Sequence, residues 1–191
     1  MLYTAVKVFH VVTVVFMSIP MFNLIVVNER AAMGPFNYPV DRFFENLIGH
    51  GARRCFVFQL TVLVTGILLL VLGPGINALW ENPVLLAKTL LLFALTGLLS
   101  YVHSQLQPRI EGLMAQVKPE APPPEAVLAS LKPIRALRKK LASYCLFILL
   151  TIIILGLQIV GFNAGLTAVL MVLAAAFSFR AFKAPVPFGW F

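Results

Sequence analysis

The chain has 191 residues, of which 60% are hydrophobic and 12% charged, and its mean hydropathy is +0.94. Soluble domains are far less apolar, so the composition indicates an all-α, polytopic membrane protein. The formal charge of +8 does not indicate a nucleic-acid partner, because the basic residues cluster in short connections between apolar runs and form no solvated basic domain.

Five apolar runs predict membrane-spanning helices, and together they make one membrane domain. The first run is too long for a cleavable signal and ends in Asn28-Glu29-Arg30, so we expect it to be retained. The last run is the shortest. The predicted spans are residues 3–27, 56–72, 83–105, 141–160 and 166–179.

The basic residues alternate between the connections. Lys and Arg are frequent in 28–55, in 106–140 and after the fifth run, whereas 73–82 and 161–165 contain none. The positive-inside rule therefore predicts an outer N-terminus and a cytoplasmic C-terminus. We expect a multi-pass protein of the bacterial inner membrane.

The two basic connections, 28–55 and 106–140, differ in their predicted structure. Residues 31–52 are rich in turn formers and aromatic side chains, so we expect this segment to lie along the cytoplasmic interface. Residues 119–124 are mostly proline and predict a stiff linker in the second connection. The basic cluster before the fourth span either sets topology and contacts lipid phosphates or binds a partner protein. This cluster is Arg135, Arg138, Lys139 and Lys140.

The third run carries a polar stripe along its predicted helix. At 100° per residue, five polar side chains fall within about a third of the helix circumference. Such a stripe is costly against lipid, so we expect it to face other helices or a bound molecule. The stripe consists of Lys88, Thr89, Thr96, Ser100 and His103.

Three ionisable residues, Lys7, His10 and Lys88, share the predicted outer leaflet. Glu81 is the one carboxylate side chain expected on that side, and it cannot neutralise two buried lysines. A bound tetrapyrrole could neutralise them, because its propionates would pair with Lys7 or Lys88 while His10 ligated the iron. The alternative is that both lysines reach lipid phosphates and His10 makes a helix–helix hydrogen bond.

Two further histidines, His50 and His103, belong near the cytoplasmic interface. They could form a bis-imidazole site for a second heme or a metal ion, or they could bond to headgroups and water. Met17 and Met21 lie on the His10 side of the first helix and are either copper ligands or packing residues.

The remaining polar side chains within the spans predict packing roles. Cys55 and Cys145 lack metal-ligand spacing, and we expect small apolar packing residues and no disulfide. Gln59, Gln158 and Asn23 are expected to form hydrogen bonds between helices.

The opening Lys7-Val-Phe-His10-Val-Val-Thr-Val-Val resembles the start of HemJ-type protoporphyrinogen oxidases and the related CopD-like membrane proteins. Trp80 and Lys88 before a leucine run, followed by Tyr101 and His103, are similar to a later region of those proteins. The resemblance implies b-type heme binding and activity through the first-helix histidine and the later lysine. These positions are His10 and Lys88 in this chain.

These observations lead to three functional hypotheses. The first is a heme b-binding membrane protein, either a protoporphyrinogen oxidase-like oxidoreductase or an electron-transfer protein, with Lys88 contributing to catalysis and His10 ligating iron. The second is a non-catalytic subunit that scaffolds a respiratory or photosynthetic complex. The third is a copper-handling permease. The lipid bilayer is the expected partner. The sequence leaves open whether further membrane subunits or a second copy of the chain also bind.

Overall fold

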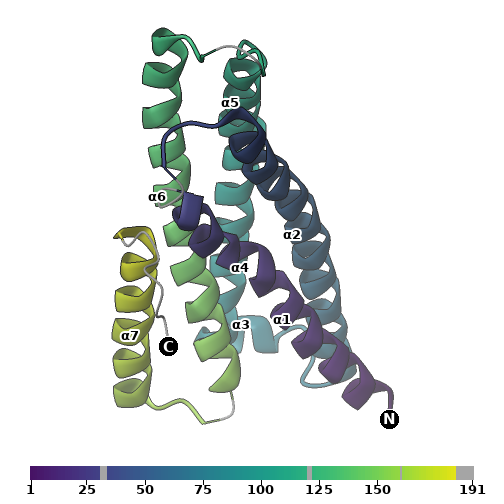
Figure 1. Cartoon of the computed structure of the whole chain (residues 1–191). Helices are drawn as coiled ribbons and strands as arrows, with labels where there is room; N and C mark the ends of the chain where they lie inside the picture. The colour runs from purple at the N-terminus through teal and green to yellow at the C-terminus, as the bar shows by residue number, and fades with distance from the viewer. Residues whose placement is uncertain (31–33, 120–121, 160, 184–191) are drawn as a thin grey trace.

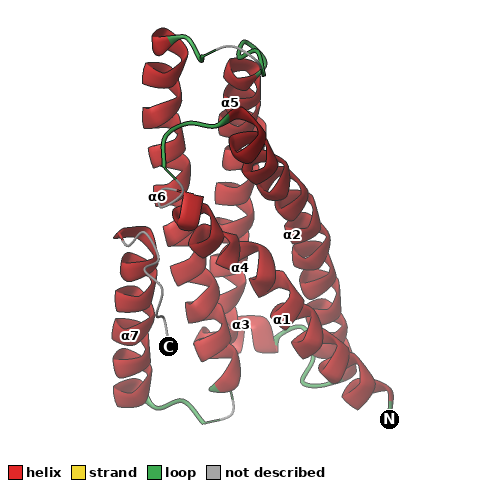
Figure 2. Cartoon of the chain, in the orientation of Figure 1, coloured by secondary structure: helices red, strands yellow, loops and turns green. Residues whose placement is uncertain are grey.

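The computed structural model of the chain describes residues 1–30, 34–119, 122–159 and 161–183. These residues form helices and no strand, as Figures 1 and 2 show. Five of the helices are long and apolar enough to cross a membrane, which confirms the predicted all-α fold with five spans. The direction in which the bundle crosses the membrane stays a prediction from the charge pattern.

The helices follow one another along the chain with short connections. One long rod contains three helical segments, because a π-helical turn links α4 to α5 without a break. A short helix, α3, precedes that rod. The bounds are α1 Leu2–Glu29, α2 Tyr38–Leu72, α3 Ala78–Glu81, α4 Pro83–Tyr101, η2 Val102–Leu106, α5 Gln107–Met114, α6 Glu125–Leu157 and α7 Ala164–Lys183.

Asparagine caps start two of the spanning rods. The side chain of Asn37 accepts a hydrogen bond from the backbone nitrogen of Val40, and a proline follows in the first turn of α2. Asn82 caps α4 in the same way, with Pro83 at the first helical position. Both starts follow from the local sequence, since asparagine satisfies free N–H groups and proline lacks one.

The spanning helices pack around a single apolar core. In Figure 1, α1 crosses the bundle obliquely from its partner α2 toward α6 and α7, while α4 and α7 lie against α6. Residues from α1, α2, α4 and α6 meet in the centre, including Met17, Cys55, Leu95, Leu146 and Leu149. Cys55 and Cys145 are both free and buried there, so the expectation of packing without a disulfide is confirmed.

Two helices extend much further than the predicted spans. α2 begins at Tyr38 and α6 at Glu125, although their apolar stretches begin only near residues 56 and 141. A helix of 35 residues is about 52 Å long, whereas the hydrocarbon layer is about 30 Å thick, so the polar first half of α2 extends beyond that layer. The expectation of a turn-rich segment is therefore wrong for residues 38–52, which are helical, and their place at the cytoplasmic interface stays a prediction.

The extensions form a second packed unit, which we call the helical cap. It consists of residues 38–52 of α2, all of α5 and residues 125–140 of α6, and it lies at the upper end of the bundle in Figure 1. The cap has its own apolar cluster of Ile110, Met114, Val117, Val127 and Leu131. The second basic connection is thus a helical hairpin against the start of α2.

Candidate functional site

His10 lies at the contact between α1 and α2. Its Nδ1 is 2.8 Å from the hydroxyl oxygen of Thr65, a buried residue of α2. The neighbouring residue is Gly66, and a Cβ atom there would lie 3.5 Å from the Cε1 of His10. The imidazole therefore packs close to the backbone of α2 at Gly66.

The hydroxyl of Thr65 determines which nitrogen of His10 carries the proton. Its oxygen is 2.7 Å from the carbonyl oxygen of Thr61 and 3.2 Å from that of Val62, so its single hydrogen is donated to the backbone. The hydroxyl can then only accept from His10, which makes Nδ1 the protonated nitrogen. Nε2 is left with a free lone pair, which is the form in which histidine ligates a metal.

Lys88 comes from α4 and is half-buried. It lies close enough to His10 for its charge to act on the imidazole. Within the described residues, its ammonium forms no hydrogen bond and no ion pair. The structure therefore brings His10 and Lys88 into one region, with a cation that the described part of the chain does not neutralise.

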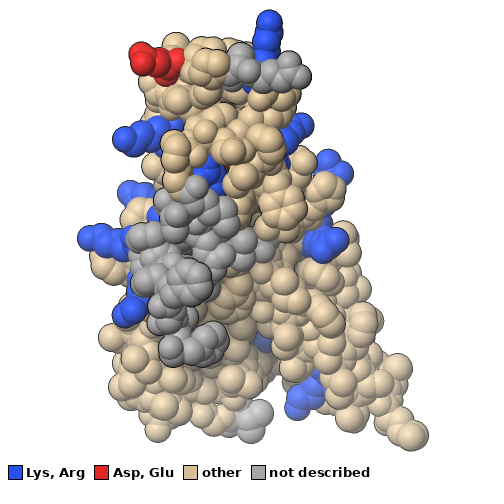
Figure 3. Space-filling model, viewed as in Figure 1, with Lys and Arg blue, Asp and Glu red and all other residues tan. Residues whose placement is uncertain are grey.

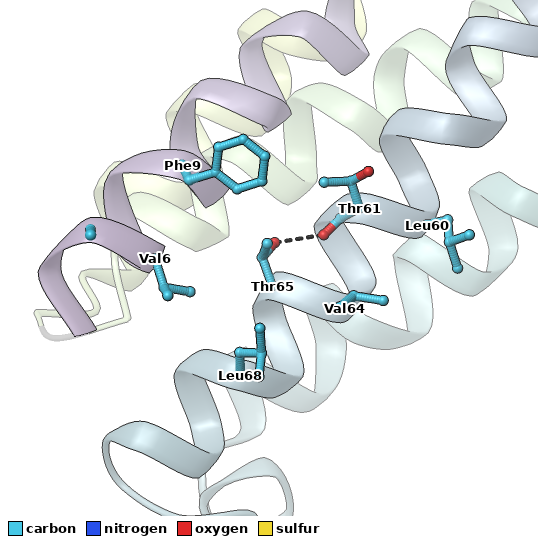
Figure 4. Close-up of a pocket in the computed structure, with 8 residues that line it drawn as sticks. Val6, Phe9, Leu60, Thr61, Val64, Thr65 and Leu68 are labelled. Atoms are coloured by element: carbon cyan, nitrogen blue, oxygen red, sulfur yellow. Dashed lines mark hydrogen bonds between the residues drawn. The ribbon is translucent and has the colours of Figure 1, made fainter. Parts of the chain in front are cut away.

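Lys7 is exposed on α1 and has no ion pair with a described residue. Glu81, the carboxylate expected on this side, is exposed at the end of α3. A groove of about 600 Å³ also opens between α1 and α2, and Thr65 lines it together with mainly aliphatic side chains (Figure 4). Thr65 therefore contacts His10 and also faces this groove.

The predicted polar stripe of α4 is half-buried and runs beside a row of buried leucines. Thr96 donates a hydrogen bond of 2.8 Å to Oε1 of Gln59 on α2, which confirms Gln59 as a group that joins helices. Gln158 plays the same role between α6 and α7, because its Oε1 accepts from Thr167 at 2.8 Å. The side chain of Asn23 lies outside the described residues.

The two inner histidines have separate environments. His50 is exposed, and its Nδ1 bonds to the carbonyl of Asn46 one turn earlier in the same helix. His103 lies in the π-helical turn, where its ring contacts Phe56 edge-on at 5.8 Å between centroids and its buried Nδ1 has no partner. Within the described residues the two rings make no contact with each other, and the bis-imidazole site stays a prediction.

In the described residues, the methionines and the side chains that could ligate a metal form no further candidate metal site. Met17 is fully buried in the apolar core, as the packing interpretation expects, and the side chain of Met21 lies outside the described residues. No group of three or more His, Cys, Asp and Glu side chains that could hold a metal ion occurs in the part of the chain that the structure describes.

Buried ion pairs in the helical cap are the feature that the sequence interpretation missed. Arg138 donates to both carboxylate oxygens of Glu45 and, at 2.8 Å, to Gln107. Arg135 bridges Glu45 at 3.0 Å and Asp41 at 2.8 Å, and Asp41 also pairs with Arg30 from the end of α1. Arg135 and Arg138 thus pair within the chain, and lipid phosphates as partners of the basic cluster stay a prediction.

The arginines determine the ionisation of Glu45, which lies ahead of the apolar stretch of α2. Burial alone would raise the pKa of this carboxyl, but the hydrogen bonds and charges of Arg138 and Arg135 outweigh burial and hold the pKa below its ordinary value of 4.5. Two spacings could have indicated the network. Asp41 and Glu45 are four residues apart, and Arg135 and Arg138 are three apart, so each pair presents like charges on one helix face.

Comparisons with protein-family models, with curated proteins and with solved structures found no match to this chain.

Proposed function

We propose that this chain is a multi-pass membrane protein that binds heme b, with Nε2 of His10 as an axial ligand of the iron and Lys88 as the partner of a propionate. The single observation that carries the proposal is the bonding of His10. The hydroxyl oxygen of Thr65 lies 2.8 Å from Nδ1, and since its own hydrogen is donated to the backbone it accepts a hydrogen bond from Nδ1, so the other ring nitrogen is unprotonated. A hydrogen bond of this kind orients the ring and increases its basicity as a ligand.

The charge of Lys88 supports an anionic ligand. A lysine inside a spanning helix costs roughly 2.5 to 3.5 kcal/mol on insertion scales, unless it reaches the interface or finds an anion. Lys88 is half-buried, and no described carboxylate pairs with it. Lys88 would pair with a propionate of bound heme, which would supply the missing negative charge.

When bound, heme supplies one-electron chemistry at its iron, and the chain supplies the ligand, the counter-charge and an apolar surrounding. The resemblance to HemJ-type proteins favours oxidation of a porphyrinogen or electron transfer as the activity. The residues of the chain then have separate roles. His10 sets the ligation, Thr65 holds the ring in one tautomer, and Lys88 positions the macrocycle.

An optical spectrum of the detergent-purified protein, with and without added hemin, tests this proposal. We expect a Soret band that shifts on reduction and is lost in His10→Ala. Lys88→Met should keep the spectral form of a histidine-ligated heme but weaken hemin binding about tenfold, since one ion pair in a partly buried site is lost. A protein that stays colourless with hemin, or an unchanged spectrum in His10→Ala, would overturn the proposal.

Three control variants separate ligation from folding. His50→Ala removes an exposed histidine that bonds only to its own helix, so the spectrum should not change. Thr65→Val removes the acceptor of the Nδ1 proton while keeping the shape of the side chain, and Thr65→Ser keeps the acceptor. We expect weaker hemin binding in the valine variant and ordinary binding in the serine variant.

A second candidate function is an accessory subunit of a larger membrane complex. It is favoured by the small share of each span that the chain itself buries, between 11% and 33% of the most apolar windows. Such surfaces face lipid or other subunits. Native mass spectrometry of the protein isolated in mild detergent distinguishes the two, since an accessory subunit would carry fixed partner masses and no heme.

A further inference from the structure

We propose that the protein holds an anionic phospholipid on the exposed side of α2, with the phosphate at Arg53 and Arg54 and an acyl chain in the groove between α1 and α2. The groove adjoins the proposed heme ligand, His10, because Thr65 contacts both, but the inference does not depend on heme binding.

The first step concerns the two arginines. Arg53 and Arg54 are exposed, and neither forms a hydrogen bond or ion pair with any described residue. They precede the apolar stretch that begins at Phe56, so they lie where that stretch meets the headgroup layer. Arg135 and Arg138, by contrast, are satisfied by carboxylates in the cap. Two free guanidinium groups at this level fit a phosphate, which arginine binds through paired N–H groups.

The second step concerns the surface below them. Four exposed apolar side chains follow the arginines at intervals of three and four residues, which places them on one side of the helix. Arg53 and Arg54 flank the line that these side chains make along α2. The four are Val57, Leu60, Val64 and Leu68. A hydrocarbon chain that starts from a phosphate at the arginines therefore meets a continuous apolar path.

The third step concerns the groove itself. Leu60, Val64 and Leu68 form its wall on α2, and Phe9 lies on the opposite wall on α1 (Figure 4). Its volume of about 600 Å³ falls in the ordinary range for ligand sites. Three of the four side chains of the exposed path thus form one wall of this open groove between α1 and α2.

The polarity of the groove selects the part of the lipid that enters it. Two hydroxyls line it, but Thr61 donates its hydrogen to the carbonyl of Val57 and Thr65 donates to the carbonyl of Thr61. The threonine side chains in the groove therefore offer no hydrogen-bond donor, and a phosphate or sugar group would lose its hydration without compensation. An acyl chain has no hydrogen bonds with water to lose. It therefore occupies the groove, while the headgroup stays at Arg53 and Arg54.

The charge distribution agrees with an anionic lipid. Most of the Lys and Arg side chains visible in Figure 3 surround the molecule between its middle and its upper end, and the lower part is largely uncharged. An acidic protein segment would also be attracted to Arg53 and Arg54. Such a segment would not use the groove, which lies lower along the apolar part of α2. The continuity of charge and groove favours the phospholipid.

Lipid binding to the full chain in detergent tests the inference. We expect dioleoyl phosphatidylglycerol to bind as a resolved adduct in native mass spectra, more tightly than dioleoyl phosphatidylcholine. Arg53→Gln/Arg54→Gln should weaken phosphatidylglycerol binding about 30-fold, from the usual effect of two basic residues at an anionic lipid. Arg109→Gln/Lys118→Gln, which removes two exposed cations of α5 and the loop after it, should have little effect.

A second pair of variants tests the groove. Val64→Trp fills the groove, and Val172→Trp places the same side chain on the exposed face of α7. We expect Val64→Trp alone to weaken binding of dioleoyl phosphatidylglycerol, while the short-chain dihexanoyl form binds the same in both. Equal binding of the two dioleoyl lipids, or no loss in the arginine variant, would overturn the site. Full loss in the arginine variant with no effect of Val64→Trp would refute the position of the acyl chain in the groove.

Discussion

Arg138→Leu tests whether buried charges hold the helical cap on the bundle. Arg138 is 6% exposed and donates to both oxygens of Glu45, which is 3% exposed, and to the side-chain oxygen of Gln107. Leucine replaces these donors with an apolar group of smaller size. Glu45 would keep its 3.0 Å hydrogen bond from Arg135 and lose the partner that contacts both of its oxygens.

The size of the effect follows from what Glu45 retains. Removing one partner of a buried ion pair costs about 3 to 5 kcal/mol, because the other charge stays buried without compensation. Arg135 compensates part of the charge here, so we expect the lower end of that range, about 3 kcal/mol of the free energy of unfolding. Lys132→Leu, at an exposed position of the same helix, should change the free energy by less than about 0.5 kcal/mol.

The assay is an unfolding titration with SDS in mixed micelles, followed by circular dichroism. A double-mutant cycle with Glu45→Leu isolates the pair, because the double variant removes both charges together. We expect the double variant to be more stable than Arg138→Leu alone, since no buried charge is left without its partner. A cost below about 1 kcal/mol for Arg138→Leu, or strictly additive costs in the cycle, would refute the view that this pair holds the cap.

Three other predictions concern the cap and the α2 contacts. Because the pKa of Glu45 lies below 4.5 in the folded protein, its ion pairs stabilise the fold fully above that pH and progressively less as the pH falls below it; thermal melts should show this loss, and Glu45→Gln should show a flatter pH profile. Gln59→Leu removes the acceptor of the Thr96 hydrogen bond and should cost about 0.6 to 1.7 kcal/mol in the same SDS titration, whereas a gain would contradict that role. Gly66→Ala should be tolerated, because its Cβ would make an ordinary contact with His10, but Gly66→Leu should displace the ring and weaken hemin binding in a spectral titration.

The spans could be predicted because their signal is local. An apolar run of about 20 residues has few alternatives in a bilayer, and prolines, glycines and asparagines mark its ends. Asn37 and Pro39 mark the start of α2, but the helical state of its first half could not be predicted in the same way. Its first half contains Asp41, Glu45, Arg53 and Arg54, so its composition is that of a loop. Its helicity depends on packing against α5 and α6, which lie far away in the sequence.

The partners of the charged residues could not be predicted for the same reason, because they lie on helices far away in the sequence. Arg135 and Arg138 stand beside two lysines in a run that reads as a typical cytoplasmic flank, and hydropathy cannot tell a buried arginine from an exposed one. The four basic residues have different environments in the structure. Both arginines pair with carboxylates of α2. The ammonium of Lys139 lies 5.3 Å from the centroid of the Phe182 ring, and Lys140 is exposed. Sequence reasoning did place His10 and Lys88 at a common depth, but not the hydrogen bond from His10 to Thr65.

The distribution of carboxylates links the cap to the proposed ligand site. Asp41 forms ion pairs with Arg30 and Arg135, and Glu45 forms one with Arg138. Glu111 accepts a hydrogen bond from Gln107 in the cap. At the other end of the spans, Glu81 is exposed and forms no ion pair in the described structure. The described chain thus neutralises its buried cations at one end and leaves Lys88 without an anion at the other. A cation in that position keeps its charge at lowest cost when a negatively charged group comes from another molecule, which is the role that the proposed ligand would have beside Lys88.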